Sequence, residues 1–176
     1  MELLKRINLI SKLTLLTALI MFIYGIICRI IPIYFFWESL YLSAIVFLIG
    51  VFFVLNFESK KIQSESKSNI VLIIGKAFTI LSIIMFVLIN ILFNNSDALK
   101  TIENHVKNNT ELTNELGQIN SVIALPIGSI NSKMDSRGKS GNATLTLLLK
   151  GDKKYKEMMF SAQKDFDSDW KTIEKN

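Results

Sequence analysis

Residues 70–100 read IVLIIGKAFTILSIIMFVLINILFNNSDALK, and the chain changes character between Phe93 and Asn94. The residues before this point are mostly apolar, whereas those after it hold 23 of the chain's 35 charged side chains, 12 basic and 11 acidic. A helical run of about 20 apolar residues crosses the hydrocarbon layer of a bilayer. We therefore predict a transmembrane region at residues 1–93 and a soluble domain at residues 96–176.

The transmembrane region contains three apolar runs, at about residues 13–28, 39–57 and 70–93. Each run satisfies the hydropathy criterion for a membrane-spanning helix. The first run, of 16 residues, is slightly short for the hydrocarbon layer, and the flanking Lys12 and Arg29 can extend it. The third run holds one charged side chain, Lys76, which we interpret as a lysine whose stem carries its ammonium group to the membrane surface. The sequence thus predicts a multi-pass membrane protein, with lipid around the first half of the chain.

Lysine and arginine are distributed unequally among the segments that flank these runs. Six lie before the first run or between the second and third, and only three lie in the first loop or just after the third run. Because basic flanks remain in the cytoplasm, we predict a cytoplasmic N-terminus and an extracytoplasmic C-terminal domain. The basic residues on the cytoplasmic side are Lys5, Arg6, Lys12, Lys60, Lys61 and Lys67, and those on the other side are Arg29, Lys100 and Lys107.

The soluble domain begins with a pattern typical of two helices. Asp97 stands at the position of an N-cap, and the helix that follows is predicted to run to about Lys107. A second, short helix is predicted over residues 110–116, with Gly117 as its left-handed C-terminal cap. Apolar residues recur at every fourth position on one face of the first helix, at Ala98, Ile102 and Val106.

From Ile119 onward the pattern changes to β-strands. Polar turns that contain glycine, at residues 138–142 and 151–154, separate the second strand from its neighbours. The expected fold is therefore membrane-anchored α+β: three transmembrane helices, then two helices packed on an antiparallel meander of three or four strands. The predicted strands cover residues 121–134, with a bend at Pro126, and residues 143–150, 155–163 and 170–174.

Short motifs follow one another through this domain in a distinctive order. They are Leu116-Gly117 after the second helix, Pro126-Ile127 in the first strand, Gly141-x-Ala143 before the second, Lys150-Gly151 at a hairpin, Ala162-x-Lys164 at a strand end, and Trp170. Their order and spacing resemble those of the cytochrome c oxidase assembly factor one family, which also includes a small subunit of the mitochondrial inner-membrane presequence translocase. The resemblance concerns the C-terminal domain only.

The motif positions also have structural explanations. Gly117 is expected to cap a helix, and Gly141 and Gly151 are expected to adopt positive φ in turns. Trp170 is expected to supply much of the apolar area of a small core. We therefore interpret the motif residues as structural, and they are Leu116, Gly117, Pro126, Gly141, Ala143, Gly151, Ala162 and Trp170.

Candidates for catalytic or metal-binding side chains are few. His105 and Cys28 are each the single residue of their type, which argues against a paired-histidine metal site and a disulfide within one chain. Three alternating aspartates resemble the start of a calcium loop, but the glycine that the loop requires next is missing. We therefore predict no catalytic residue, no metal site and no cofactor. The aspartates are Asp165, Asp167 and Asp169.

The resemblance implies a non-enzymatic assembly factor in an inner membrane. Mitochondrial members of the family have a single anchor and a targeting segment, whereas this sequence has three apolar runs and no Arg-rich presequence, so we expect a bacterial relative with an elaborated anchor. It would assist assembly of a cytochrome oxidase or a related respiratory complex by protein–protein contacts. The expected partners are membrane lipid and respiratory oxidase subunits, held by the face or edge of the sheet. Small residues in the spans would add contacts within the bilayer, at Gly25, Gly50 and Gly75.

Other classes of function fit the residues less well. The excess of positive charge belongs to the transmembrane half, which has eight basic and four acidic residues, and no basic stripe for nucleic acid occurs in the soluble domain. An integral-membrane enzyme would need paired titratable groups, which the sequence does not place together. The main alternative is a membrane-anchored envelope sensor or binding module that recognises a peptide or a small ligand.

Overall fold

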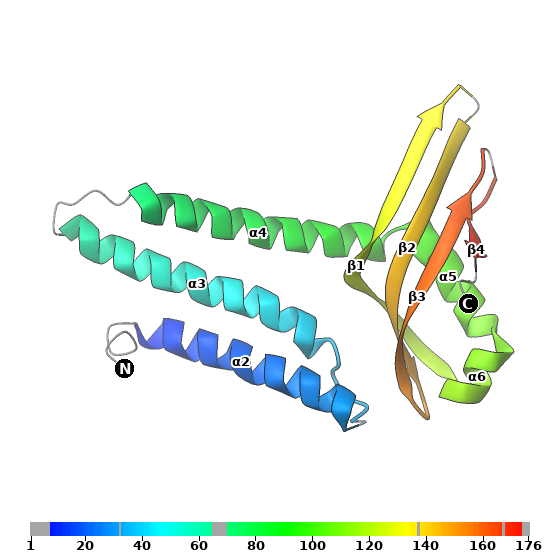
Figure 1. Cartoon of the computed structure of the whole chain (residues 1–176), viewed down its shortest axis with the longest axis horizontal. Helices are drawn as coiled ribbons and strands as arrows, with labels where there is room; N and C mark the ends of the chain where they lie inside the picture. The colour runs from blue at the N-terminus through cyan, green and yellow to red at the C-terminus, as the bar shows by residue number, and fades with distance from the viewer. Residues whose placement is uncertain (1–7, 32, 65–69, 137, 167, 174–176) are drawn as a thin grey trace. The chain divides into compact units, whose positions relative to one another are not determined.

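The computed structural model describes residues 8–31, 33–64, 70–136, 138–166 and 168–173. The chain divides into two compact units, Met1–Val87 and Leu88–Asn176 (Figure 1). The first unit is helical, and the second combines helices with a β-sheet.

Three long helices are found where the apolar runs were predicted: α2 (Leu9–Ile30), α3 (Ser39–Ser64) and α4 (Ile70–Asn94). All three are long and apolar enough to cross a membrane. α2 and α3 extend beyond the predicted runs and include charged residues such as Lys12. Lysine is a good helix former, so the end of the apolar run does not end the helix.

Glycines allow the helices of the first unit to approach closely. A Cβ atom on Gly25 would lie 2.7 Å from the backbone nitrogen of Leu40, and one on Gly50 would lie 2.7 Å from Leu15 Cδ2. Both contacts join α2 to α3, which lie side by side (Figure 1). Gly25 and Gly50 therefore serve close packing between helices of this chain, and the expected contribution of these glycines to contacts with a partner within the bilayer stays a prediction. Gly75 of α4 similarly approaches the side chain of Leu55.

The second unit contains two helices on one face of a four-stranded sheet (Figure 1). α5 (Asp97–Asn108) and α6 (Thr110–Leu116) precede the strands β1 (Ile119–Asp135), β2 (Gly138–Gly151), β3 (Tyr155–Lys164) and β4 (Lys171–Ile173). The strand order is β1-β2-β3-β4, and each neighbouring pair is antiparallel. The predicted α+β composition and the antiparallel meander are confirmed.

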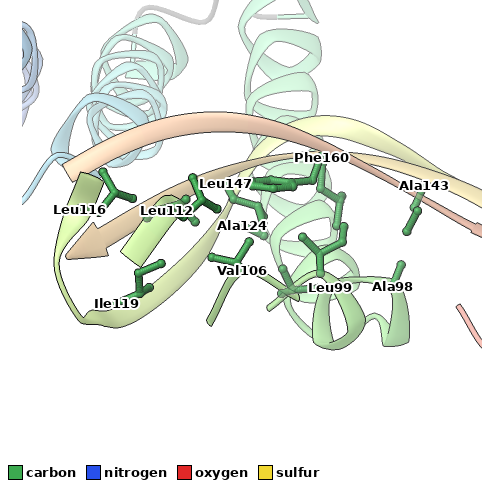
Figure 2. Close-up of a cluster of buried hydrophobic side chains, with 14 residues drawn as sticks. Ala98, Leu99, Val106, Leu112, Leu116, Ile119, Ala124, Ala143, Leu147 and Phe160 are labelled. Carbon is green, nitrogen blue, oxygen red and sulfur yellow. The ribbon is translucent and has the colours of Figure 1, made fainter. Parts of the chain in front are cut away.

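The core of the second unit lies between the helices and the sheet (Figure 2). The predicted apolar face of α5 is buried, and Ile102 and Val106 are fully enclosed. Leu112, Leu116 and Ile119 lie at one end of the cluster, and Ala98 and Ala143 lie at the other (Figure 2). Every second residue of this part of β2 points into the core, as alternation along a strand requires; these residues are Ala143, Leu145, Leu147 and Leu149. Leu148, on the opposite face of the strand, is buried as well, outside this cluster.

Two local predictions were wrong. The N-cap of α5 is Ser96, whose Oγ accepts a hydrogen bond from the backbone N–H of Leu99 at 3.2 Å. Asp97 is instead the first helical residue, where a carboxylate favours the helix dipole. Residues 138–142 form the start of β2 and not a turn, because β1 pairs with them as far as Asp135. A polar, glycine-containing segment reads as a turn when its partner strand is unknown.

Candidate functional site

Three of the motif residues join the end of α6 to the hairpin between β2 and β3. Gly117 is the C-cap of α6, with φ of +81°, as the sequence predicted. The backbone N–H of Lys153 donates to the carbonyl oxygen of Leu116 at 2.9 Å. A Cβ atom on Gly151 would overlap that same carbonyl oxygen and would lie 2.8 Å from Leu116 Cβ. Gly151 therefore lets the helix end dock directly on the hairpin.

Two of the predicted glycine conformations were wrong. Among the described glycines, positive φ occurs at Gly117, Gly128 and Gly138, and not at Gly141 or Gly151. The last two lie in regular β2, where their importance is the missing side chain and not backbone freedom. Sequence alone does not distinguish these two uses of glycine, because the second depends on a neighbour that is distant in the chain.

Four further motif residues form a second contact group at the other end of the sheet. A Cβ atom on Gly141 would lie 2.9 Å from Trp170 Cη2, so the absence of a side chain makes room for the indole. Ala143 and Ala162 are direct partners in the β2–β3 register, and both are buried. Trp170 is half-buried and packs against the core cluster. These small residues leave space for α5 and Trp170 to pack on the sheet.

Pro126 lies in an irregular part of β1. The register with β2 shifts between Ala124 and Gly128, and Pro126 stands within that interval. Because proline has no backbone N–H for the ladder, it is tolerated in a sheet at such irregularities. A register irregularity therefore lies where the bend was predicted, and β1 continues through it to Asp135.

A charge cluster that the sequence did not predict joins α6 to β3 and to the turn that precedes it. Glu115 Oε2 is 2.7 Å from the ammonium of Lys156, and Glu115 Oε1 is 3.1 Å from that of Lys154. The hydrogen bonds from Lys156 and then Lys154 lower the pKa of Glu115 below its ordinary value. The partners are 41 and 39 residues apart in sequence, so no local pattern could have indicated the cluster.

The residues considered for catalysis and metal binding are not brought together. Within the described ranges, no three side chains of His, Cys, Asp or Glu type are grouped to hold a metal ion. His105 is half-buried on α5, and Cys28 is buried in α2. Asp165 follows β3 and accepts a hydrogen bond from Gln163, while Asp167 lies outside the described residues.

A cleft of about 410 Å³ lies at the end of the sheet that contains the β1–β2 hairpin. Side chains from three strands line it, among them Asn131 of β1, Asn142 of β2 and Gln163 of β3. Sequence reasoning missed these residues. Alternation along each strand would place them on one face, but only the strand register places them beside one another.

One known protein family matches the sequence of the α+β unit and of most of the helix before it. The model of the family described as cytochrome oxidase complex assembly protein 1 matches residues 71–175. This chain belongs to that family. The resemblance inferred from the motifs is thereby confirmed, and the matched range takes in nearly all of α4 as well as the α+β unit. α2 and α3 precede the residues that the model of the cytochrome oxidase assembly family matches. No curated protein and no solved structure matches the chain significantly.

Proposed function

We propose that this chain is a membrane-anchored, non-enzymatic assembly factor for a cytochrome oxidase or a related respiratory complex. The main support for this proposal is the match to the cytochrome oxidase assembly family, which covers both α4 and the α+β unit. An assembly role requires a surface that holds a partner, and it requires no bond to be made or broken. The α+β unit would hold an oxidase subunit while that subunit matures.

The location of the α+β unit follows from the helices that precede it. Three helices with the length and hydropathy of membrane spans would place the C-terminus on the side opposite the N-terminus. Lys60 and Lys61 at the end of α3, together with Lys12 near the start of α2, favour a cytoplasmic side for these ends. The α+β unit would then be extracytoplasmic, at the inner membrane of a bacterium.

The sheet provides a surface suited to a partner. β1 is an edge strand of 17 residues, whereas the opposite edge, β4, has three. A long edge strand leaves backbone groups available for an added strand. Lys133, Pro126 and the register shift after Ala124 interrupt this edge, as is common where uncontrolled sheet association must be avoided.

The proposal is tested in the organism that encodes the chain. Deletion of the gene should lower the spectroscopically measured haem content of the membrane oxidase, and affinity purification in mild detergent should recover oxidase subunits. Complementation with a Leu147→Ala chain, which opens a core cavity, should fail, whereas Leu81→Ala on exposed α4 should restore the oxidase. Normal oxidase content in the deletion strain, with no subunit recovered, would reject the proposal.

The proposed topology is tested separately. The full-length chain should stay in the membrane pellet after alkaline extraction. A reporter fused after Asn176 should be active only outside the cytoplasm. Recovery of the chain in the alkaline supernatant would contradict membrane anchoring, and reporter activity in the cytoplasm would reverse the orientation.

A further inference from the structure

A row of side-chain amides crosses the sheet of the α+β unit. Asn131 of β1 is the register partner of Asn142 of β2, and Asn142 is the partner of Gln163 of β3. Gln163 in turn is opposite Lys171 of β4. Residues directly opposite one another in a sheet project from the same face with their Cβ atoms about 5 Å apart. The three amides therefore form one continuous row, which we call the amide row.

The amide row lies on the face of the sheet that is turned away from α5 and α6. Ala143 and Ala162, which follow Asn142 and precede Gln163, are buried in the helix-facing core. Because successive side chains of a strand alternate between faces, Asn142 and Gln163 point to the opposite side. Asn131, Asn142 and Gln163 are all exposed.

The neighbouring rows on this face are polar as well. Ser129, Thr144 and Ser161 form the next row on one side, with Thr144 Oγ1 and Ser161 Oγ 3.4 Å apart. Lys133 and its partner Ser140 form the row on the other side. Lys133 and Ser140 line the cleft of about 410 Å³ together with the amide row.

The chemistry of the amide row matches that of a peptide backbone. Each side-chain amide has a carbonyl acceptor and an N–H₂ donor, so it can pair with the N–H and C=O groups of an extended chain. Within the described ranges, Asn131 and Asn142 form no side-chain hydrogen bond, and Gln163 Nε2 donates to Asp165 Oδ1 at the long distance of 3.3 Å. These groups are therefore available to a ligand.

The charged side chains around the cleft determine which extended peptides it would favour. Lys133 and Lys164 line it, and Lys171 ends the amide row, whereas Asp165 is the acidic residue in the lining. The three lysines form no ion pair with the described residues. Ammonium groups without counter-ions attract carboxylates, which contributes mostly to selectivity and to the rate of association.

We propose that the amide row binds an extended, acidic peptide segment of a partner protein. The amides pair with the backbone of the segment, and the lysines contact its carboxylates. This inference rests on the proposed assembly function and gives the chemistry of the subunit segment that would be held. The helix-facing motif residues Gly141, Ala143 and Ala162 support the strands from behind.

The experiment uses the full-length protein in lipid nanodiscs and a displayed library of random decapeptides. Selected peptides should be enriched in Asp and Glu, and binding of the synthesised peptides should weaken as salt is added. The double variant Asn142→Asp/Gln163→Glu keeps the side-chain shape but replaces donors by negative charge, so it should raise the peptide Kd by about tenfold or more. The matched control is Asn104→Asp/Asn114→Asp on α5 and α6, which changes net charge equally and should leave Kd unchanged.

Several outcomes would overturn the inference. Selected peptides without acidic bias, or equal binding by both double variants, would reject it. If Asn142→Asp/Gln163→Glu alters folding, Asn142→Ala/Gln163→Ala takes its place, and unchanged peptide affinity would again reject it. Inorganic phosphate bound in the absence of any selected peptide would identify a simple anion site. Loss of self-association in the variant, without peptide binding, would assign the face to a second copy of the chain.

The failure of this inference is distinguishable from that of the assembly function. If gene deletion leaves the oxidase normal but acidic peptides bind through the amide row, the inference stands and the assembly function fails. If deletion lowers the oxidase and the Asn142→Ala/Gln163→Ala chain restores it fully, without any acidic peptide bound, the assembly function stands and the inference fails.

Discussion

The two units of this chain use the same apolar residue types in opposite ways. On α4, Val71 is 81% exposed and Phe78 is 70% exposed, whereas Leu145 and Leu147 of β2 are fully buried. An exposed apolar helix surface is stable where lipid replaces water, and a small domain in water must enclose its apolar side chains. The difference teaches that the two units present opposite surfaces: apolar side chains point outward from the long helices of the first unit and inward in the second.

Glycine also differs between the units. Gly25 and Gly50 bring one helix against another, whereas Gly141 and Gly151 bring an indole and a helix end against a strand. At these four positions the missing Cβ atom is what matters, whereas Gly117, Gly128 and Gly138 of the α+β unit use the backbone freedom of glycine at positive φ. Close packing of helices is the main source of association in lipid, while in the α+β unit it adds to hydrophobic burial.

The largest effect is expected for a cavity in the α+β unit. Leu147→Ala removes a fully buried side chain and should destabilise this unit by about 4 kcal/mol. Pulse proteolysis of the full-length protein in detergent across a urea series would measure the loss. The control, Leu81→Ala on α4, removes a side chain that is 57% exposed and should leave the urea midpoint unchanged. Equal losses would contradict the distinction between the two apolar surfaces.

The next effect concerns the glycine contacts. Gly151→Ala places a methyl group against the backbone carbonyl of Leu116, which cannot move without the end of α6, and should destabilise the α+β unit by about 3 kcal/mol. The same proteolysis assay measures it. Gly75→Ala is the control, since its nearest neighbour is the end of the flexible Leu55 side chain at 3.3 Å. If the Gly151→Ala variant keeps the urea midpoint of the unchanged protein, the contact between position 151 and the carbonyl group of Leu116 is not tight.

A smaller effect is expected in the helical unit. Gly25→Ile places a branched side chain against the backbone of Leu40, at 2.7 Å from its nitrogen, and should weaken the α2–α3 contact by about 1–2 kcal/mol. Loss of helicity in mixed micelles of increasing SDS content would report it. Gly75→Ile should shift the SDS midpoint less. The protease resistance of the α+β unit should remain unchanged in both, and its loss would show that the units are not independent.

The smallest effect concerns the charge cluster of Glu115. Because the pKa of this carboxyl is lowered in the folded protein, its contribution to stability is present above its ordinary pKa and is lost as pH falls through the lowered value. Glu115→Gln should reduce the Tm by about one degree at neutral pH, as for exposed ion pairs, and the difference should vanish in strong acid. Glu111→Gln on the same helix is the control. If the Glu115→Gln variant changed the Tm more in acid than at neutral pH, the ionised Glu115 would not be the stabilising form, which would contradict the lowered pKa.

Local chemistry explains why much of the fold was predictable. The apolar runs, the α5 face at Ile102 and Val106, and the cap at Gly117 depend on neighbours within a few residues, so their patterns are visible in the sequence. The N-cap was misplaced by one residue because Ser96 and Asp97 are both good capping types. The start of β2 was missed because its strand identity comes from pairing with β1 and not from its own residues.

The sequence by itself determined that the first part of the chain is built of helices with apolar surfaces and the second is an α+β unit, and its motifs indicated the family. Only the tertiary structure decided that Gly141 lies against Trp170 and that Gly151 lies against Leu116. It also decided that Asn131, Asn142 and Gln163 form one row. The physical reason is the distance along the chain between the residues that interact. Hydropathy and helix caps are properties of neighbouring residues, whereas a contact across the sheet depends on register, which is fixed only when distant strands pair.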